Sequence, residues 1–233
     1  MSVYPGKFTG YDYDVDICLV IDRTGSMRPI IDTVKENALS LHRDITARMQ
    51  AKGKTVAGLR VRVIWFGDYL ADGPGAMVAS DFLTLPEQNA ALEQCVSGIR
   101  AEGGGDIPED GLEALAFAIR SRWCQGTAKK RHIICLFTDA PAHALGFGAA
   151  AEGYPASAPK DFDELTDMWG FGQYPGEMDS YAKRLLLFAP DQSFWHTIAR
   201  GWENAVIRTT RADQGLSDVS YQVMLDTIVN SVG

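Results

Sequence analysis

The sequence predicts an α/β protein built on a mostly parallel sheet with helices on both faces. Apolar segments of strand length, at residues 16–21, 59–69 and 132–139, alternate with amphipathic segments of helix length. The chain has 233 residues, 46% of them hydrophobic and 22% charged, which is enough for one large core. It carries no internal repeat. Together these observations favour a three-layer, doubly wound, Rossmann-like fold in a single domain.

The first half of the chain supplies two of the expected parallel strands. Residues 16–21 form an apolar strand, and a long amphipathic helix is expected from about 27 to 51, where Gly53 ends it. Residues 59–69 are rich in β-branched side chains and predict the second strand. Residues 80–85 predict a short antiparallel edge strand.

The second half continues the alternation. Helices are expected at 86–99, from Pro108 to about 123, and at 181–188, 193–200 and 219–232, with strands at 132–139 and 204–210. We expect one domain over 14–233, an N-terminal extension over 1–13, and a long insert over about 140–179. Loops of this length in a compact domain are usually either functional or disordered.

Charge and composition exclude several classes of function. The net charge of −8 argues against nucleic acid as a partner, and no apolar run is long enough to cross a bilayer. The N-terminus lacks the pattern of a secretory signal, and the four cysteines show no CxxC pairing. We therefore expect a cytoplasmic protein with reduced thiols. There is no phosphate-binding glycine loop followed by lysine, so no small-molecule cofactor is expected.

Oxygen-bearing side chains follow the expected strands. Asp22, Thr24 and Ser26 come directly after the first strand, and Asp139 ends the strand at 132–139. A third loop, GGGDIPE, contributes Asp106 and Glu109 (residues 103–109). Because ligands bind at the carboxyl ends of parallel strands, we expect these groups to converge. An oxygen-only set without His or Cys suits Mg²⁺, with Mn²⁺ or Ca²⁺ as alternatives.

These motifs resemble a known family. D-R-T-G-S at 22–26 is similar to the D-x-S/T-G-S signature of von Willebrand factor A-type (vWA) domains, and T-D at 138–139 matches the pair that completes their metal-ion-dependent adhesion site (MIDAS). The third loop resembles that of stand-alone intracellular bacterial members. The resemblance extends over nearly the whole chain, from about residue 14 to 232.

The resemblance implies a role for each residue. Thr24 and Ser26 would coordinate the ion directly, and Asp22 and Asp139 would act directly or through bound water. Asp106 takes the place that the family usually gives to a threonine, and Glu109 is the alternative ligand in this loop. A third carboxylate would neutralise more of the ion's charge and weaken its pull on a partner's carboxylate.

The function implied is a metal-dependent protein-binding or scaffold module without catalytic residues, whose protein partner supplies a carboxylate to the ion. His143, Trp169 and Phe171, in the insert near the metal face, are candidate partner contacts. An Mg²⁺-assisted phosphoryl or ester hydrolase using the same carboxylates is the alternative function. A simpler interpretation of Ser26 also remains open, because a serine at this position can cap the following helix.

Overall fold

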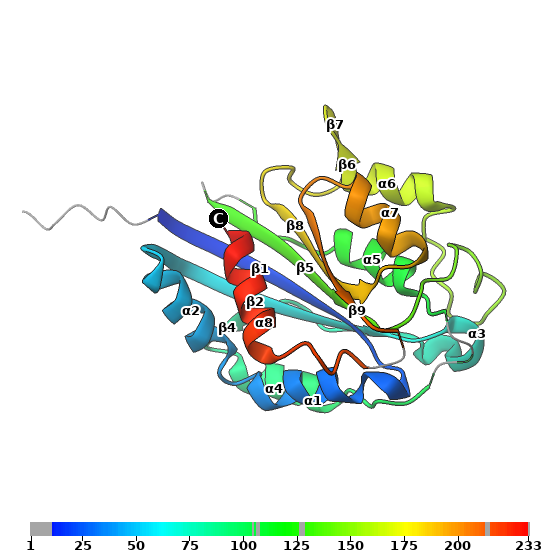
Figure 1. The fold of residues 1–233 in the computed structure, drawn as a ribbon, viewed down its shortest axis with the longest axis horizontal. Helices are drawn as coiled ribbons and strands as arrows, with labels where there is room; N and C mark the ends of the chain where they lie inside the picture. The colour runs from blue at the N-terminus through cyan, green and yellow to red at the C-terminus, as the bar shows by residue number, and fades with distance from the viewer. Residues whose placement is uncertain (1–10, 104, 106–107, 126–128, 213–214, 233) are drawn as a thin grey trace, which may run out of the picture.

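The protein folds around one central sheet of mainly parallel strands with helices on both faces (Figure 1). The computed structural model describes residues 11–103, 105, 108–125, 129–212 and 215–232. The sheet order is β3-β2-β1-β5-β8-β9, and β4 pairs with the edge of β2. Strands β1, β2, β5, β8 and β9 are parallel, whereas β3 and β4 run antiparallel to β2. This confirms the predicted fold class.

The strands of the main sheet are β1 (Tyr11–Asp22), β2 (Lys54–Phe66), β3 (Met77–Ala79), β4 (Leu83–Leu85), β5 (Lys130–Phe137), β8 (Lys183–Pro190) and β9 (Ala205–Thr210). The helices are α1 (Arg28–Asn37), α2 (Leu41–Ala51), α3 (Tyr69–Asp72), α4 (Asn89–Ser97), α5 (Gly111–Ile119), α6 (Phe162–Trp169), α7 (Ser193–Gly201) and α8 (Tyr221–Val232). A separate hairpin joins β6 (Gly170–Phe171) to β7 (Tyr174–Pro175).

Alternation along β1 creates two cores. Ile17, Leu19 and Ile21 belong to the core under α1, α2, α4 and α8, whereas Cys18 and Val20 belong to the core under α5, α6 and α7. Successive side chains of a strand point to opposite faces, so a strand that is apolar throughout must be covered twice. Figure 1 shows the two helical layers on either side of the sheet.

The strand order reverses between β1 and β5. From β1 the chain proceeds outward to β2 on one side, and later returns to place β5, β8 and β9 on the other. Ile21 of β1 pairs with Phe137 of β5, so the two neighbouring strands end at the same level. Loops after such strands diverge and leave a ligand-binding crevice in folds of this type.

Two predicted helices differ from the structure. Residues 181–188 were expected to be helical, but 183–190 form β8, buried between β5 and β9. A short continuous apolar run fits either a buried strand or a buried helix, and here the neighbouring strands decide it. The helix expected over 27–51 is two helices, because the chain turns at Ser40, whose amide and hydroxyl both donate to the Asn37 carbonyl.

The other boundaries shift by a few residues. The predicted antiparallel edge strand is present as β4, and a further short strand, β3, precedes it. Strand β1 begins at Tyr11, inside the expected N-terminal extension. The insert at 140–179 contains α6 and the β6–β7 hairpin, which the sequence did not indicate. None of the helices in the described ranges combines the length and apolarity needed to span a bilayer.

Candidate metal centre

Asp22 is the most deeply buried acid at the ends of β1 and β5. Its side chain is fully buried. Oδ1 accepts hydrogen bonds from the Thr24 amide (2.8 Å) and the Thr24 hydroxyl (2.6 Å), and Oδ2 accepts one from the Thr138 hydroxyl (2.7 Å). Burial raises the pKa of Asp22 to about 6, opposed by the bonds from Thr24 and Thr138. Asp22 therefore fixes both loops in position.

Ser26 and Asp139 join the two loops directly. The Ser26 hydroxyl donates to Oδ1 of Asp139 at 3.0 Å and lies 3.5 Å from the Thr24 hydroxyl. The other carboxylate oxygen of Asp139 accepts the Gly215 amide at 2.7 Å. The structure thus brings together Asp22, Thr24, Ser26 and Asp139, as the sequence predicted. Ser26 is exposed, so this group of oxygens opens to solvent.

The helix-capping interpretation of Ser26 is wrong. Helix α1 begins at Arg28, its N-cap is Met27, and no side-chain bond caps it. The short 3₁₀ turn over Gly25–Met27 likewise lacks a side-chain cap. The Ser26 hydroxyl is directed instead to a carboxylate 113 residues away. Its position serves the junction between the loops rather than the helix end.

Glu109 lies beside this junction. Its amide donates to the Pro141 carbonyl at 3.0 Å, and its own carbonyl accepts the His143 amide at 3.0 Å, so the third loop is paired to the loop that follows Asp139. The side chain is 3% exposed. Among the described residues, no hydrogen-bond donor reaches its Oε2. The rival ligand, Asp106, lies outside the described residues.

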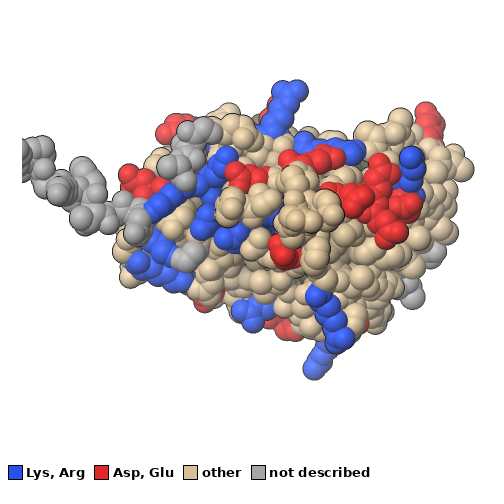
Figure 2. Space-filling view, turned by 90° about the horizontal axis from the view of Figure 1, so that it is seen from above, with Lys and Arg blue, Asp and Glu red and all other residues tan. Residues whose placement is uncertain are grey.

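Several further carboxylates surround Glu109. Burial raises its pKa to about 9, with additional contributions from Asp22, Asp68, Asp72 and Asp110. Asp68 accepts the amides of Leu70 and Ala71 at the start of α3, and Asp110 accepts the Tyr69 amide at 2.6 Å. Asp22, Asp68 and Asp110 are buried, so they are distinct from the acidic side chains that Figure 2 shows on the surface toward the right-hand end of the molecule.

Asp68 was missed in the sequence, although a signal for it exists. It follows β2 by two residues, in the same way that Asp139 follows β5. Extending the carboxyl-end rule to every parallel strand would have found it. A concentration of buried carboxylates with too few donors is costly unless protons or cations compensate it. This set of carboxylate and hydroxyl oxygens therefore fits a hard divalent cation.

The predicted partner contacts differ in exposure. Trp169 is fully buried, stacks on Trp202 with ring centroids 5.3 Å apart, and donates to the Glu203 carbonyl. His143 is also buried, lies 3.3 Å from Oδ2 of Asp68 and stacks on Phe147. Neither side chain offers a surface to a partner, because both pack inside the domain. Phe171 is 55% exposed and remains a candidate contact.

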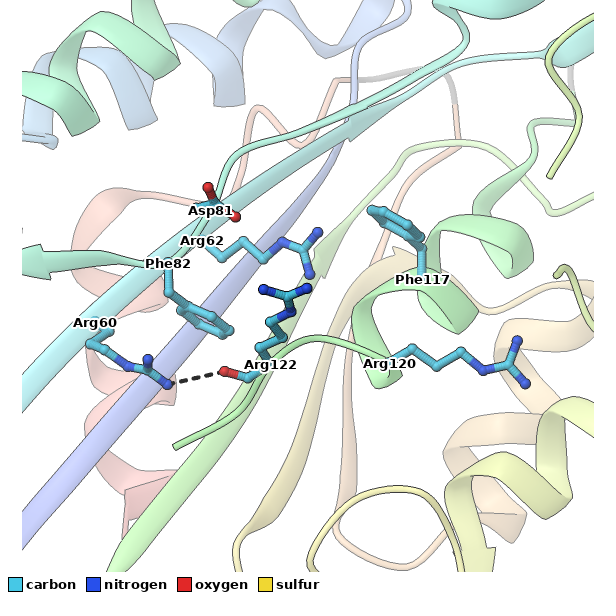
Figure 3. Close-up of a pocket in the computed structure, with 7 residues that line it drawn as sticks. All are labelled: Arg60, Arg62, Asp81, Phe82, Phe117, Arg120 and Arg122. Carbon is cyan, nitrogen blue, oxygen red and sulfur yellow. Dashed lines mark hydrogen bonds between the residues drawn. The ribbon is translucent and has the colours of Figure 1, made fainter. Parts of the chain in front are cut away.

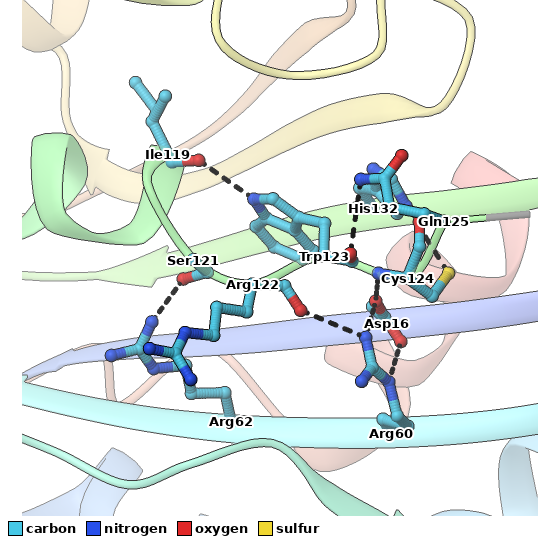
Figure 4. A network of polar contacts seen from close by, with 10 residues as sticks. All are labelled: Asp16, Arg60, Arg62, Ile119, Ser121, Arg122, Trp123, Cys124, Gln125 and His132. Atoms are coloured by element: carbon cyan, nitrogen blue, oxygen red, sulfur yellow. Dashed lines mark hydrogen bonds and ion pairs between the residues drawn. The ribbon is translucent and has the colours of Figure 1, made fainter.

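A second group of potential ligands lies near the other end of the strands. Ligand atoms of Asp16, Cys124 and His132 lie within 4.8 Å of one another. However, Asp16 is already bound by the Arg60 guanidinium at 2.8 and 2.6 Å and by the Cys124 amide at 2.6 Å (Figure 4). These bonds use both carboxylate oxygens, so the group is an internal polar network. The protein's four cysteines are free.

The sequence similarity of this chain to known proteins is low. No family model matches the chain. The α-protein kinase vwkA of Dictyostelium discoideum is 24% identical over 159 residues, which are 66% of this chain and 23% of that protein. The chain thus spans about a quarter of the length of the curated relative that it matches.

Among solved structures, the pilus adhesin SpaC from Lactobacillus rhamnosus GG aligns with 94% of this chain and 30% of its own, with a TM-score of 0.55 and 14% identity. The von Willebrand factor domain of the pilus tip protein Mfa5 from Porphyromonas gingivalis aligns with 94% of this chain and 96% of its own, with a TM-score of 0.49 and 11% identity. At these identities, the similarity to SpaC concerns the fold alone.

Proposed function

We propose that this chain is a vWA-type domain that binds proteins through a divalent cation at the carboxyl ends of β1 and β5. The observation that supports the proposal is the convergence of Asp22, Thr24, Ser26 and Asp139, with hydrogen bonds linking segments more than a hundred residues apart. The buried Oε2 of Glu109 accepts no hydrogen bond from the described residues, and it adds an oxygen ligand for a cation. Mg²⁺ is the proposed ion, with Mn²⁺ or Ca²⁺ as alternatives.

Thr24 and Ser26 would hold the ion by their hydroxyls, and Asp22 and Asp139 would hold it directly or through water. Asp106 or Glu109 would complete the set. The bound ion would supply a positive centre for a carboxylate of a protein partner. With several acids nearby, this attraction is expected to be moderate, and binding to be reversible.

We further propose that the module is not an enzyme. The hydrolase alternative would need a general base, and the imidazole of His143 is packed between Asp68 and Phe147 inside the domain. The kinase name belongs to a relative of which this chain matches only a small part. An adhesin neighbour is consistent with a binding role. Four cysteines without a disulfide support the proposed cytoplasmic location.

A chelator-controlled binding experiment tests this function. The immobilised protein is exposed to cell extract in Mg²⁺ or in EDTA, and captured proteins are compared between wild type and Thr24→Val, which removes one hydroxyl ligand. Thr33→Val is the matched control, because Thr33 lies on α1 and donates only to the Pro29 carbonyl. We expect a partner that is lost both in EDTA and with Thr24→Val. A partner set that is indifferent to both would contradict the proposal.

A further inference from the structure

A pocket rich in arginine lies on the α5 face of the sheet. It has a volume of about 530 Å³ and lies between β2, the segment before β4 and the C-terminal end of α5 (Figure 3). Its lining residues are Arg60, Arg62, Asp81, Phe82, Phe117, Arg120 and Arg122. A site lined by so many cations is unexpected in a protein with a net charge of −8.

Two of these arginines are neutralised by neighbouring acids. The Arg60 guanidinium forms a bidentate ion pair with Asp16 and also donates to the Arg122 carbonyl (Figure 4). Arg120 forms a similar pair with Glu177, at distances of 2.9 to 3.1 Å. Both side chains are therefore held as fixed parts of the pocket wall.

Arg62 and Arg122 differ from them, since neither forms an ion pair with an acid in the described part of the chain. Arg62 is positioned by neutral groups only, because its Nε donates to the Ser80 carbonyl and its Nη1 to the Ser121 hydroxyl. In Figures 3 and 4 the guanidinium groups of Arg62 and Arg122 lie side by side. Asp81 also lines the pocket but forms no ion pair with either of them. Two adjacent like charges repel each other, and an anion placed against them would remove this cost.

Aromatic rings complete the walls. The Arg60 guanidinium lies over the ring of Phe82, 4.6 Å from its centroid, and the Arg62 guanidinium lies over Phe117 at 4.9 Å. These cation–π contacts hold the guanidinium planes in place. Phe117 is also 40% exposed, which is unusual for a ring that serves only the core. The pocket therefore offers both fixed cations and apolar surface to one ligand.

We propose that this pocket binds a phosphate monoester whose organic part is apolar or aromatic. A phosphate monoester carries nearly two negative charges, matching the two uncompensated guanidinium groups, and its oxygens accept paired N–H bonds from arginine. The apolar part would rest against Phe82 and Phe117. The volume lies in the range of small-molecule sites. The group is either free or carried on a protein side chain. This site is separate from the proposed metal centre.

Calorimetric titration with phenyl phosphate tests the proposal, in buffer containing EDTA so that the metal centre makes no contribution. We expect saturable binding, and weaker binding of inorganic phosphate, which lacks the ring. Arg122→Gln, an exposed substitution, and Arg62→Lys, which keeps the charge but loses the planar fork, should each weaken phenyl phosphate about tenfold or more. Arg43→Gln is the matched control, because Arg43 lies on α2 on the opposite face and pairs with Asp44. Circular dichroism of each variant establishes that it is folded.

Two further arms complete the experiment. Asp22→Asn should leave phenyl phosphate binding unchanged, which separates this pocket from the metal centre. A short peptide with one phosphotyrosine identifies the source of the phosphate: tighter binding than phenyl phosphate indicates a protein-borne group, and weaker binding a free one, and either result supports the pocket. The absence of heat at millimolar phenyl phosphate would overturn the proposal. So would an Arg43→Gln variant that weakens phenyl phosphate binding as much as Arg62→Lys and Arg122→Gln do. Equal affinity for inorganic phosphate would overturn the role of the two rings.

Discussion

The Ser26 hydroxyl donates a 3.0 Å hydrogen bond to Oδ1 of Asp139, 113 residues further along the chain. This bond depends on two parallel strands that end at the same level, since β1 delivers the Asp22–Ser26 loop and β5 delivers Asp139. The other carboxylate oxygen of Asp139 accepts a hydrogen bond from the Gly215 amide, in the segment that leads to α8. Two distant segments, the loop after β1 and the segment before α8, therefore fix the Asp139 carboxylate.

Gly215→Ala should disrupt this arrangement. Gly215 has a φ of 57°, and a methyl group there would collide with the Ser26 carbonyl oxygen and approach Cδ of Pro29 to 2.9 Å. We expect a loss of more than about 2 kcal/mol in the free energy of unfolding, measured with urea, because backbone strain and a clash add together. Gly53→Ala is the control: its φ is 69° but its surroundings are open, so only the strain of about 1 kcal/mol should appear. Equal losses would contradict the packing described.

Much of this arrangement could be predicted from the sequence. Asp22, Thr24, Ser26 and Asp139 follow directly after strands whose apolar character is continuous, so the rule for parallel sheets places them together. The arginine pocket could not be predicted in this way. Arg60 and Arg62 look like the outward residues of an ordinary alternating strand, and only the tertiary position of Arg122, after α5, shows that the cations meet. Strand β8 was missed because a short apolar run carries no distinguishing period.

Glu113→Gln should alter the pH dependence of stability. Burial and the nearby Asp110 raise the pKa of Glu113 from 4.5 to about 7, opposed by the hydrogen bond from the Tyr154 hydroxyl. Because the folded protein holds this proton more tightly than the unfolded chain, stability should be highest below pH 4.5 as far as this group is concerned, and fall as the pH rises toward 7. Glutamine never ionises, so the variant should gain up to about 3 kcal/mol over wild type at pH 8.

Urea unfolding at pH 5 and pH 8 measures this difference. Glu152→Gln, which changes an exposed glutamate in the 140–179 insert, serves as the control and should follow the wild-type curve. The prediction fails if Glu113→Gln loses stability at pH 8 or keeps the wild-type pH dependence. Either result would show that a contact absent from this structure stabilises the ionised carboxylate of Glu113.

Glu109→Gln and Asp106→Asn should identify the acid of the third loop that supports the ion. Glu109 is buried, and the charge of Asp22 contributes to the raised pKa of its carboxyl. We therefore expect Glu109→Gln to weaken Mg²⁺ binding about tenfold, and Asp106→Asn to weaken it less. Isothermal titration of both variants at one pH measures the ranking. The reverse ranking would assign the role to Asp106.

The most direct test of the account is the titration of Mg²⁺ into chelator-stripped wild type, Asp22→Asn and Asp32→Asn. Asp22 bonds both Thr24 and Thr138 at the proposed centre, whereas Asp32 is exposed on α1. The account predicts saturable binding of one ion by wild type and Asp32→Asn, and at least about tenfold weaker binding by Asp22→Asn with the fold intact. No binding by wild type, or equal binding by all three proteins, would contradict it.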